Sequence, residues 1–390
     1  MYKLKLIDWN IGGAKYLELK SREYLKSNEY LESDEYLKLK TKGETEESRE
    51  DFRANLNRAL DILIRRERPA IVMLQEVVRY HPEGDQSRAE HVIDIPDGYD
   101  YYTLPLIDTV HHSHQGKWDK VRTKGRWSKE AFFSQGNAIL VNTMIPHFHV
   151  FRLPAIDQPT NSFKDADPME TVKLESGLYF GDRNTEPRAA IVMHLVLSKL
   201  IDMRKPDAAH PPLNKPLDIF AINLHLTTLT MEREGVPDID EEAAYIRQRQ
   251  IEIVLNGIVS RYNRWRRDKY RIRGEKTTPD IDETHERHPP IWIIGGDFNF
   301  TPESIEYLTM VRRGFIDLMP SHSVGTKASG LGKDPTLTLD YVFAGPRFEA
   351  IDPAVAAEGI KFNRVEVSDD TKVSDHFPLI IDLPIVLSNP

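Results

Sequence analysis

The chain contains no cysteine among its 390 residues. This absence excludes disulfide bonds and thiolate metal sites, and a cytoplasmic location fits it best. The sequence also lacks any apolar run near the roughly 20 residues that a membrane-spanning helix needs, so we expect no membrane span. The first apolar segment, residues 3–9, carries Asp8 and therefore indicates a strand and not a signal peptide.

An excess of positive charge is absent too. There are 52 Lys and Arg against 61 Asp and Glu, which gives a formal net charge of −9. This balance disfavours a basic protein that coats nucleic acid. Local basic patches can still attract a polyanion, because salt screens charges that lie more than about 10 Å apart.

What the sequence does have is a series of short, β-rich apolar runs with few helical patterns between them. Apolar residues keep a helical spacing over 50–67 and 241–267, and Thr301 followed by Pro302 predicts another helix start. This order favours antiparallel or mixed sheets covered by helices, an α/β sandwich. The predicted strands are 3–9, 70–75, 99–104, 136–142, 147–153, 188–197, 217–224, 291–294, 339–344 and 377–383.

Four polar stretches interrupt this pattern, and we interpret them as insertions in a single domain spanning 1–390. They lie at about 14–49, 105–135, 154–186 and 261–289. Within the last, residues 261–276 hold eight Lys and Arg against two acids, with Tyr262, Trp265 and Tyr270 between them. Basic residues with aromatics suit phosphate contact and base stacking, although a solvated helix end has the same composition.

Polar side chains recur where the predicted strands end or begin. Because a strand's end lies beside its neighbour's beginning in an antiparallel pair, these groups can gather on one rim of the sandwich. The candidates are Asn10, Glu76, His225, Asp297, Asn299, Asp340, Asp375 and His376.

Such a rim has a specific chemistry. Carboxylate and amide oxygens without thiolates suit a hard cation such as Mg²⁺ or Mn²⁺, with Glu76 as the best ligand. Asp340 can hold His376 in one tautomer and stabilise its charged form. Asp297 can orient or deprotonate a water, and Asn299 can bind a phosphoryl oxygen. This set of roles indicates metal-assisted hydrolysis of a phosphoester.

Six segments in this order, "WNIGG", "LQEV", "INLHL", "GGDFNFTP", "LDYVF" and "SDHFPL", resemble the signature of the endonuclease/exonuclease/phosphatase superfamily, with its deoxyribonuclease I-like fold. The resemblance implies a four-layer α/β sandwich, with two mostly antiparallel sheets packed face to face and helices outside. It also implies hydrolysis of phosphoesters with a divalent metal ion as the cofactor. We expect this ion to be Mg²⁺, with Mn²⁺ as a substitute.

The resemblance carries further roles to individual positions. Glu76 and Asn10 match the metal-side ligands, with Asp375 as a further one. His225 matches the second histidine of deoxyribonuclease I-like and sphingomyelinase-like members. Arg188, in "EPRAAIVMHL", matches more loosely the place of an arginine that contacts phosphate.

The substrate is not fixed by these motifs. The leading hypothesis is a nuclease that cuts DNA or RNA, based on the basic stretches 261–276 and 117–129. The alternative is a phosphatase or phosphodiesterase acting on a small or lipid phosphoester, as the acidic net charge suggests. A binding module without catalysis is the third reading, which the complete set of candidate residues argues against. Two departures narrow the subfamily: Gly12 stands where abasic-site endonucleases carry Asp, and Tyr341 stands where phosphoinositide 5-phosphatases carry Arg, which weakens the latter interpretation. The oligomeric state stays open.

Overall fold

The computed structural model describes only part of the chain. The described residues are 2–12, 49–82, 90–108, 131–143, 170–174, 188–199, 212–227, 237–260, 291–319, 325–328, 335–345 and 373–385. The predicted strand at 147–153 and the basic stretches 117–129 and 261–276 lie outside these ranges. The division into one domain with four insertions stays a prediction.

Two six-stranded sheets pack face to face. Sheet A has the order β14 (Leu379–Ile385), β1 (Tyr2–Asn10), β2 (Ile71–Pro82), β5 (Ala131–Asn142), β4 (Tyr99–Asp108), with β3 (Glu90–His91) paired to β2. Sheet B has the order β10 (Ile316–Asp317), β13 (Asp340–Gly345), β9 (Ile291–Asp297), β8 (Pro212–His225), β7 (Arg188–Lys199), β6 (Glu170–Leu174). A small third sheet pairs β11 (Lys327–Ala328) with β12 (Pro335–Leu337).

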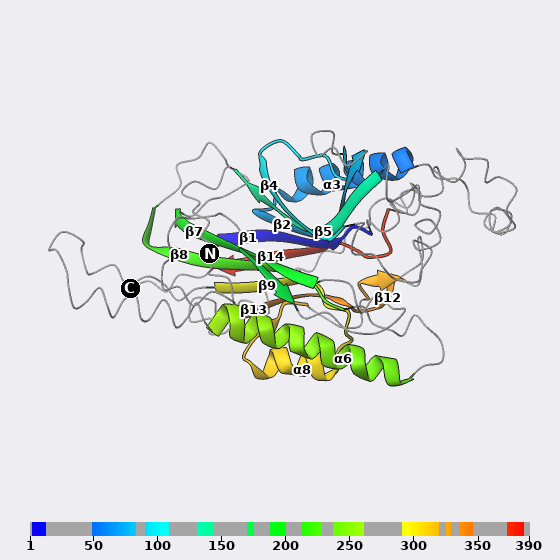
Figure 1. The fold of residues 1–390 in the computed structure, drawn as a ribbon. Coiled ribbons are helices and arrows are strands. Elements are labelled where there is room, and N and C mark those ends of the chain that lie inside the picture. Colours follow the sequence, from blue (N-terminus) through cyan, green and yellow to red (C-terminus); the bar gives the residue numbers. More distant parts are fainter. Residues whose placement is uncertain are drawn as a thin grey trace, which may run out of the picture.

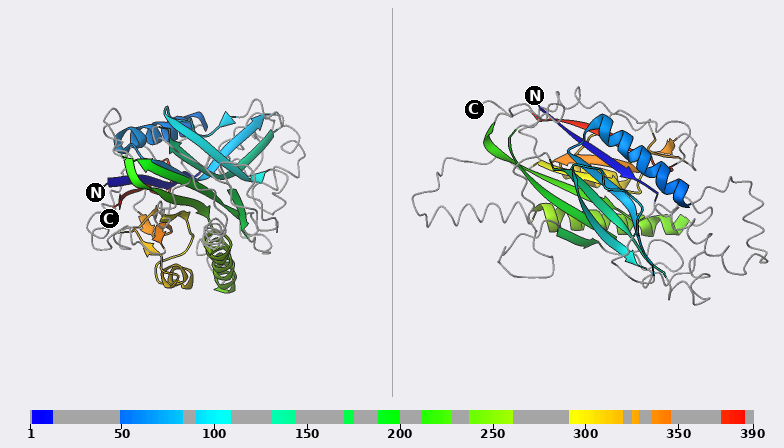
Figure 2. Two further views of the ribbon diagram at one scale, coloured as in Figure 1. Left: turned by 90° about the vertical axis from the view of Figure 1, so that its left-hand side faces the viewer. Right: turned by 90° about the horizontal axis from the view of Figure 1, so that it is seen from above.

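Helices cover the outer faces of both sheets (Figures 1 and 2). Helix α3 (Arg49–Glu67) lies on sheet A. On sheet B lie α8 (Ile305–Arg312) and α6 (Pro237–Glu252), which continues as the π-helical segment η5 (Ile253–Ser260). The layers are therefore helix, sheet, sheet and helix, and the predicted four-layer α/β sandwich is confirmed.

The alternation of side chains along β1 shows how one strand joins two cores. Leu4 and Leu6 belong to the apolar cluster that includes residues of both sheets. Ile7 and Trp9 belong to a second cluster with the apolar face of α3. Because successive strand residues point to opposite faces, a strand that is buried on both faces needs apolar residues at neighbouring positions, as at Leu6 and Ile7.

Each six-stranded sheet contains one parallel pair of strands. β1 pairs in parallel with β2, and β8 with β9, while the other ladders of the described sheets are antiparallel. A parallel pair needs a crossover, and α3 and α6 lie in the two connections. The carboxyl ends of β8 and β9 therefore lie side by side, whereas β1 ends beside Gln75 in the middle of β2, which continues to Pro82.

The start of α8 differs from the sequence prediction at Thr301 and Pro302. Ser304 is the N-cap, and its hydroxyl accepts a hydrogen bond from the Tyr307 N–H. Glu303 has a positive φ of 71°, which no right-handed helix accommodates. The helix therefore begins after Glu303, because only there can the backbone turn right-handed.

Two consecutive glycines near the end of β9 permit close packing. A Cβ on Gly295 would overlap the side chain of Met73, which comes from the other sheet. A Cβ on Gly296, whose φ is +143°, would overlap the backbone carbonyl of Leu224 on the neighbouring strand. Gly296 therefore requires glycine for β9 to reach the rim, whereas at Gly295 the flexible end of the Met73 side chain would have to move.

In the helices that the structure describes, no segment is both long enough and apolar enough to cross a bilayer.

We expect Gly296→Ala to prevent folding or to lower the free energy of unfolding by more than about 4 kcal/mol, since it combines overlap with backbone strain. Gly98→Ala is the matched control, because Gly98 also has a positive φ of 81° but its Cβ would meet only Thr143 Oγ1 at 4.0 Å. Chemical denaturation of both variants measures the difference. Equal losses would contradict the packing explanation.

Candidate active site

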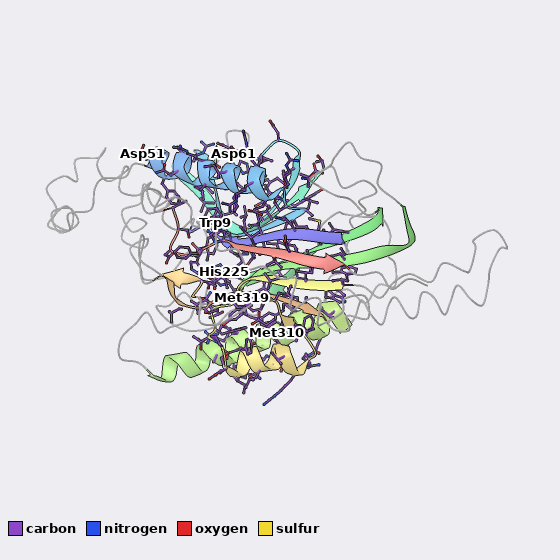
Figure 3. All side chains as sticks on the ribbon, turned by 180° about the vertical axis from the view of Figure 1, so that it is seen from behind. Trp9, Asp51, Asp61, His225, Met310 and Met319 are labelled. Atoms are coloured by element: carbon purple, nitrogen blue, oxygen red, sulfur yellow. The ribbon has the colours of Figure 1, made fainter. Side chains whose placement is uncertain are left out.

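The predicted site residues of both sheets meet at one rim of the sandwich. Asn10 ends β1 and His225 ends β8. In sheet B the register pairs His225 with Asp297, and Asp297 with Asp340. His376 lies just before β14, which runs antiparallel to β1. Figure 3 shows His225 between Trp9 and Met319, at the level where the two sheets face each other.

Asp297 contacts more of these residues than any other member of the described cluster. Its Oδ2 accepts a hydrogen bond from Asn10 Nδ2 at 3.0 Å, which joins sheet B to sheet A. The same oxygen lies 3.5 Å from His225 Nε2 and 3.7 Å from His376 Nε2. Its Oδ1 accepts from the backbone N–H of Asn299 at 3.0 Å. A carboxylate so held, and only 2% exposed, has a fixed direction toward both imidazoles.

His376 is paired with Asp340. Its Nδ1 lies 3.0 and 2.9 Å from the two carboxylate oxygens, so Nδ1 carries the hydrogen and Nε2 is turned to Asp297. Burial alone would lower the pKa of His376, but the negative charges of Asp340 and Asp297 outweigh it and raise this pKa to about 10. The imidazole is therefore a cation at neutral pH.

Glu76 and Asn10 lie together on the sheet A side. The Asn10 side chain donates from Nδ2 to Glu76 Oε1 at 3.4 Å and accepts from the Gly12 N–H. The prediction that the strand ends at residue 75, just before Glu76, is wrong, because β2 continues to Pro82. Glu76 lies inside β2 where the β2–β5 register shifts, and its φ is +57°. Asn299 is also left-handed, at +52°. Strained non-glycine residues concentrate at functional sites, so these two conformations support the assignment of the rim.

The ligand atoms of Asp297, Asp340 and His376 all lie within 4.8 Å of one another. The Asp340 and His376 side chains are already hydrogen-bonded to each other, as in an acid–base pair. Glu76 is only half-buried and stands beside the amide of Asn10. Oxygen donors of this kind fit a hard divalent cation. Metal binding by Glu76, Asn10 and Asp375 stays a prediction.

The remaining predicted residues are placed less closely. Asp375 is half-buried next to His376, and its charge helps to raise the pKa of that histidine. Arg188 opens β7 beside the end of β8 and is buried. The register sets Ala190 opposite Leu224, so these two side chains share one face of the sheet. Arg188, two residues before Ala190, lies on that same face, whereas His225, next to Leu224, lies on the opposite face. The contact of Arg188 with phosphate stays a prediction.

A buried polar group under the rim was missed by the sequence reasoning. Asn223 donates from Nδ2 to the carbonyls of Leu74 and Ala138, at 2.9 and 2.7 Å, across the two sheets. Gln75 Nε2 donates to Asn223 Oδ1 and to Asp8 Oδ1, both at 2.8 Å. These bonds surround the register shift that carries Glu76. Asn223 stands two residues before His225, a spacing that places both on one face of β8 and could have indicated it.

Burial raises the pKa of Asp8 well above its usual value, and the charges of Asp340 and Asp297 raise it further, against the hydrogen bond from Gln75. This carboxyl lies beneath the rim, and the raised pKa favours its neutral form. Asp8 was recognised in the sequence only as a polar interruption of the first strand.

Two hydroxyls hold the segments that carry His376 and Asp340. Ser374 Oγ donates to the Asn10 carbonyl at 2.8 Å and accepts from the His376 N–H at 3.1 Å. Thr326 Oγ1 accepts from the N–H groups of Leu339 and Asp340 at 2.9 and 3.0 Å. No motif around Thr326 marked it in the sequence.

The model of the endonuclease/exonuclease/phosphatase family matches residues 9–376. The chain therefore belongs to this family, whose members are generally hydrolases that act on phosphoesters. No curated protein matches the sequence.

Solved structures with a similar fold have low sequence identity. The endonuclease/exonuclease/phosphatase of Beutenbergia cavernae is 14% identical with a TM-score of 0.45, over 99% of this chain and 72% of that one. The human Nocturnin catalytic domain is 13% identical with a TM-score of 0.45, over 99% and 94%. D. rerio TDP2 complexed with a single strand DNA product is 12% identical with a TM-score of 0.41, over 97% and 98%.

We expect the metal-free protein to lose stability as the pH rises from about 6.5, the pKa of an unfolded histidine, to about 10, the pKa of His376 in the fold. A pKa raised by folding stabilises the fold fully below the unfolded pKa, and this stability is lost as the pH passes the folded one. Asp340→Asn removes the largest cause of the raised pKa and should flatten the loss. Urea unfolding of both proteins in EDTA at about pH 6, 8 and 10 measures it. If the free energy of unfolding falls with pH equally in both proteins, the assignment of a positive charge to His376 at neutral pH is wrong.

Proposed function

We propose that this protein is a divalent-metal-dependent phosphoester hydrolase, and that it is a nuclease cleaving phosphodiester bonds of DNA or RNA by attack of water. The observation that carries the proposal is the convergence on Asp297. One buried carboxylate oxygen lies within 3.0–3.7 Å of Asn10, His225 and His376, which come from three different strands or strand ends.

Asp297 is the group that positions the attacking water and takes its proton. The water oxygen bonds to phosphorus, the proton passes to the carboxylate, and the leaving oxygen departs with the electrons of its bond to phosphorus. A general base needs to lie within hydrogen-bond reach of that proton, and Asp297 is fixed by Asn10 and by the Asn299 backbone.

His376 supplies positive charge at the same place. Because Asp340 holds its Nδ1, the protonated Nε2 is left to donate to a phosphoryl oxygen as negative charge develops there. His225 comes from sheet B, and its Nε2 lies 3.5 Å from Oδ2 of Asp297. Asn299 donates from Nδ2 to the Leu226 carbonyl at 3.2 Å, which fixes its carboxamide beside Asp297 for contact with the phosphoryl group.

The rim also suits the metal that the proposal requires. Several carboxylates lie near His376, whose pKa they raise or whose rim they share: Glu76, Asp297, Asp340 and Asp375. A divalent cation balances the negative charge of such a group. Glu76 and Asn10 would hold the ion, with Asp375 as a third ligand and Mg²⁺ or Mn²⁺ as the ion. When bound, it stabilises the negative charge of the phosphoryl oxygens.

The nucleic-acid substrate rests on the basic sequences 117–129 and 261–276, the latter with three aromatic residues. A phosphatase or phosphodiesterase acting on a small or lipid phosphoester is the second candidate, because the net charge of −9 opposes general attraction of a polyanion. The cytoplasmic location expected from the cysteine-free sequence stays a prediction.

A panel of plasmid, linear and single-stranded DNA, RNA, nucleotides and inositol phosphates tests the substrate class. We expect nucleic acid to be cut with Mg²⁺, cutting to stop in EDTA and to return with excess Mg²⁺. Affinity for the cut substrate should fall steeply with salt, because each neutralised phosphate contributes about 0.7–0.9 to the slope of log K against log salt. Intact nucleic acid together with phosphate release from small substrates would show that the second candidate is correct.

We expect His376→Ala and Asp297→Ala each to lower kcat by at least about 10²-fold, since each removes a group that moves a proton or stabilises charge. Asp340→Asn should lower it less, through the tautomer and charge of His376. Asp61→Asn is the control, because Asp61 lies on α3, away from His225 (Figure 3), in an exposed ion pair with Arg65. Circular dichroism checks folding. Near wild-type rates in the three site variants would mean that the rim is misassigned.

A further inference from the structure

Asp340 and His376 are carried by different sheets, one at the start of a strand and the other just before a strand. Asp340 begins β13 in sheet B, whereas His376 precedes β14 in sheet A. No ladder of backbone hydrogen bonds joins these two strands in the described sheets. The distances of 2.9 and 3.0 Å between the two side chains therefore depend on contacts outside the ladders.

Thr326 is hydrogen-bonded to the backbone of both segments. Its hydroxyl accepts from the N–H of Asp340 at 3.0 Å, and from that of Leu339 at 2.9 Å. Its carbonyl accepts from the N–H of Phe377, the residue after His376, at 2.9 Å. Thr326 itself is fully buried, and its own N–H donates to the Leu337 carbonyl at 2.7 Å. One residue thus connects the two ends of the acid–base pair.

The hydroxyl has a role that an apolar side chain of the same shape cannot replace. It satisfies two adjacent buried N–H groups, and a buried donor without a partner costs about 1–3 kcal/mol. Valine at this position would therefore favour a shift of the Asp340 backbone toward other acceptors. Because Nδ1 of His376 contacts both oxygens of one carboxylate, such a shift changes the direction of Nε2 toward Asp297.

We propose that Thr326 is a positioning residue for the Asp340–His376 pair: its hydroxyl and carbonyl fix, across the two sheets, the distance at which Asp340 orients His376. The inference rests on the proposed function, in which this pair takes part in turnover. Thr326 is fully buried and acts only through the pair. Its removal is therefore felt in kcat, with KM unchanged.

A double-mutant cycle tests the inference. Thr326→Val should lower kcat by about ten- to a hundredfold, the cost of a small misplacement of a catalytic group. In the Asp340→Asn background the same change should have little further effect, because the pair is already broken. Thr326→Ser keeps the hydroxyl and should restore most of the rate.

Thr227→Val is the matched control, because Thr227 is also fully buried and its hydroxyl accepts a hydrogen bond from Gln250 Nε2 at 2.9 Å. Thr227→Val should change kcat by the same factor in the wild-type and the Asp340→Asn backgrounds, because the two sites act independently. If Thr326→Val does not fold, Thr326→Ala is used in its place. The His376 Nδ1–H resonance in proton NMR should then move upfield relative to wild type, as its hydrogen bond to Asp340 weakens.

The outcomes separate the two proposals. If Asp340→Asn leaves kcat unchanged, the proposed function of the pair fails. If Asp340→Asn lowers kcat but the Thr326 effect multiplies with it, or if the serine variant is as slow as valine, Thr326 has only a structural role and the inference is wrong. An unchanged Nδ1–H resonance in Thr326→Ala also overturns it.

Discussion

The hydrogen bond between Asn10 and Asp297 is the contact on which the site depends, because it joins the rims of the two sheets at 3.0 Å. Each six-stranded sheet contributes one parallel strand pair to this rim, β8 and β9 by their carboxyl ends and β1 by its end beside the middle of β2. The sandwich therefore brings together groups that are 287 residues apart along the chain. If the two sheets did not meet here, Glu76 and Asn10 would lie at the edge of one sheet. Asp297 and His225 would lie at the edge of the other, and no single site would contain all four.

The cost of this arrangement is visible around the rim. Glu76 and Asn299 adopt left-handed backbone conformations, and Gly296 permits an approach that a Cβ would block. Asn223 donates a buried hydrogen bond to the Leu74 carbonyl, close to Glu76, and Thr326 accepts one from the Asp340 N–H. The carboxylates repel one another, and the raised pKa of His376 shows how strongly they favour a nearby positive charge. Strain and negative charge together make the rim suited to a cation and a phosphoryl group.

Much of the fold could be predicted from the sequence, since apolar periodicity reports which face is buried. The helix at 50–67 was expected from Phe52 and Leu56, and both are fully buried under sheet A. The start of α8 at Ser304 was not, because Glu303 takes a conformation that propensity disfavours. The candidate site residues could be picked out because most of them stand at or beside a strand end, and the structure brings them to one rim, while their roles stay predictions. Glu76 is the exception, because β2 continues past it to Pro82. Thr326 and Asn223 could not be picked out, because their roles are hydrogen bonds to backbone groups distant in sequence.

Direct observation of a bound ion tests the central claim, that both sheets build one metal-dependent site. Crystals soaked in MnCl₂ would be measured for anomalous scattering at the manganese edge. The account predicts a peak at the rim within bonding distance of a Glu76 carboxylate oxygen and beside Asn10. The ion should lie close enough to Asp297 for one phosphoryl group to contact both. Manganese bound elsewhere, or no peak at the rim at saturating concentration, would contradict it.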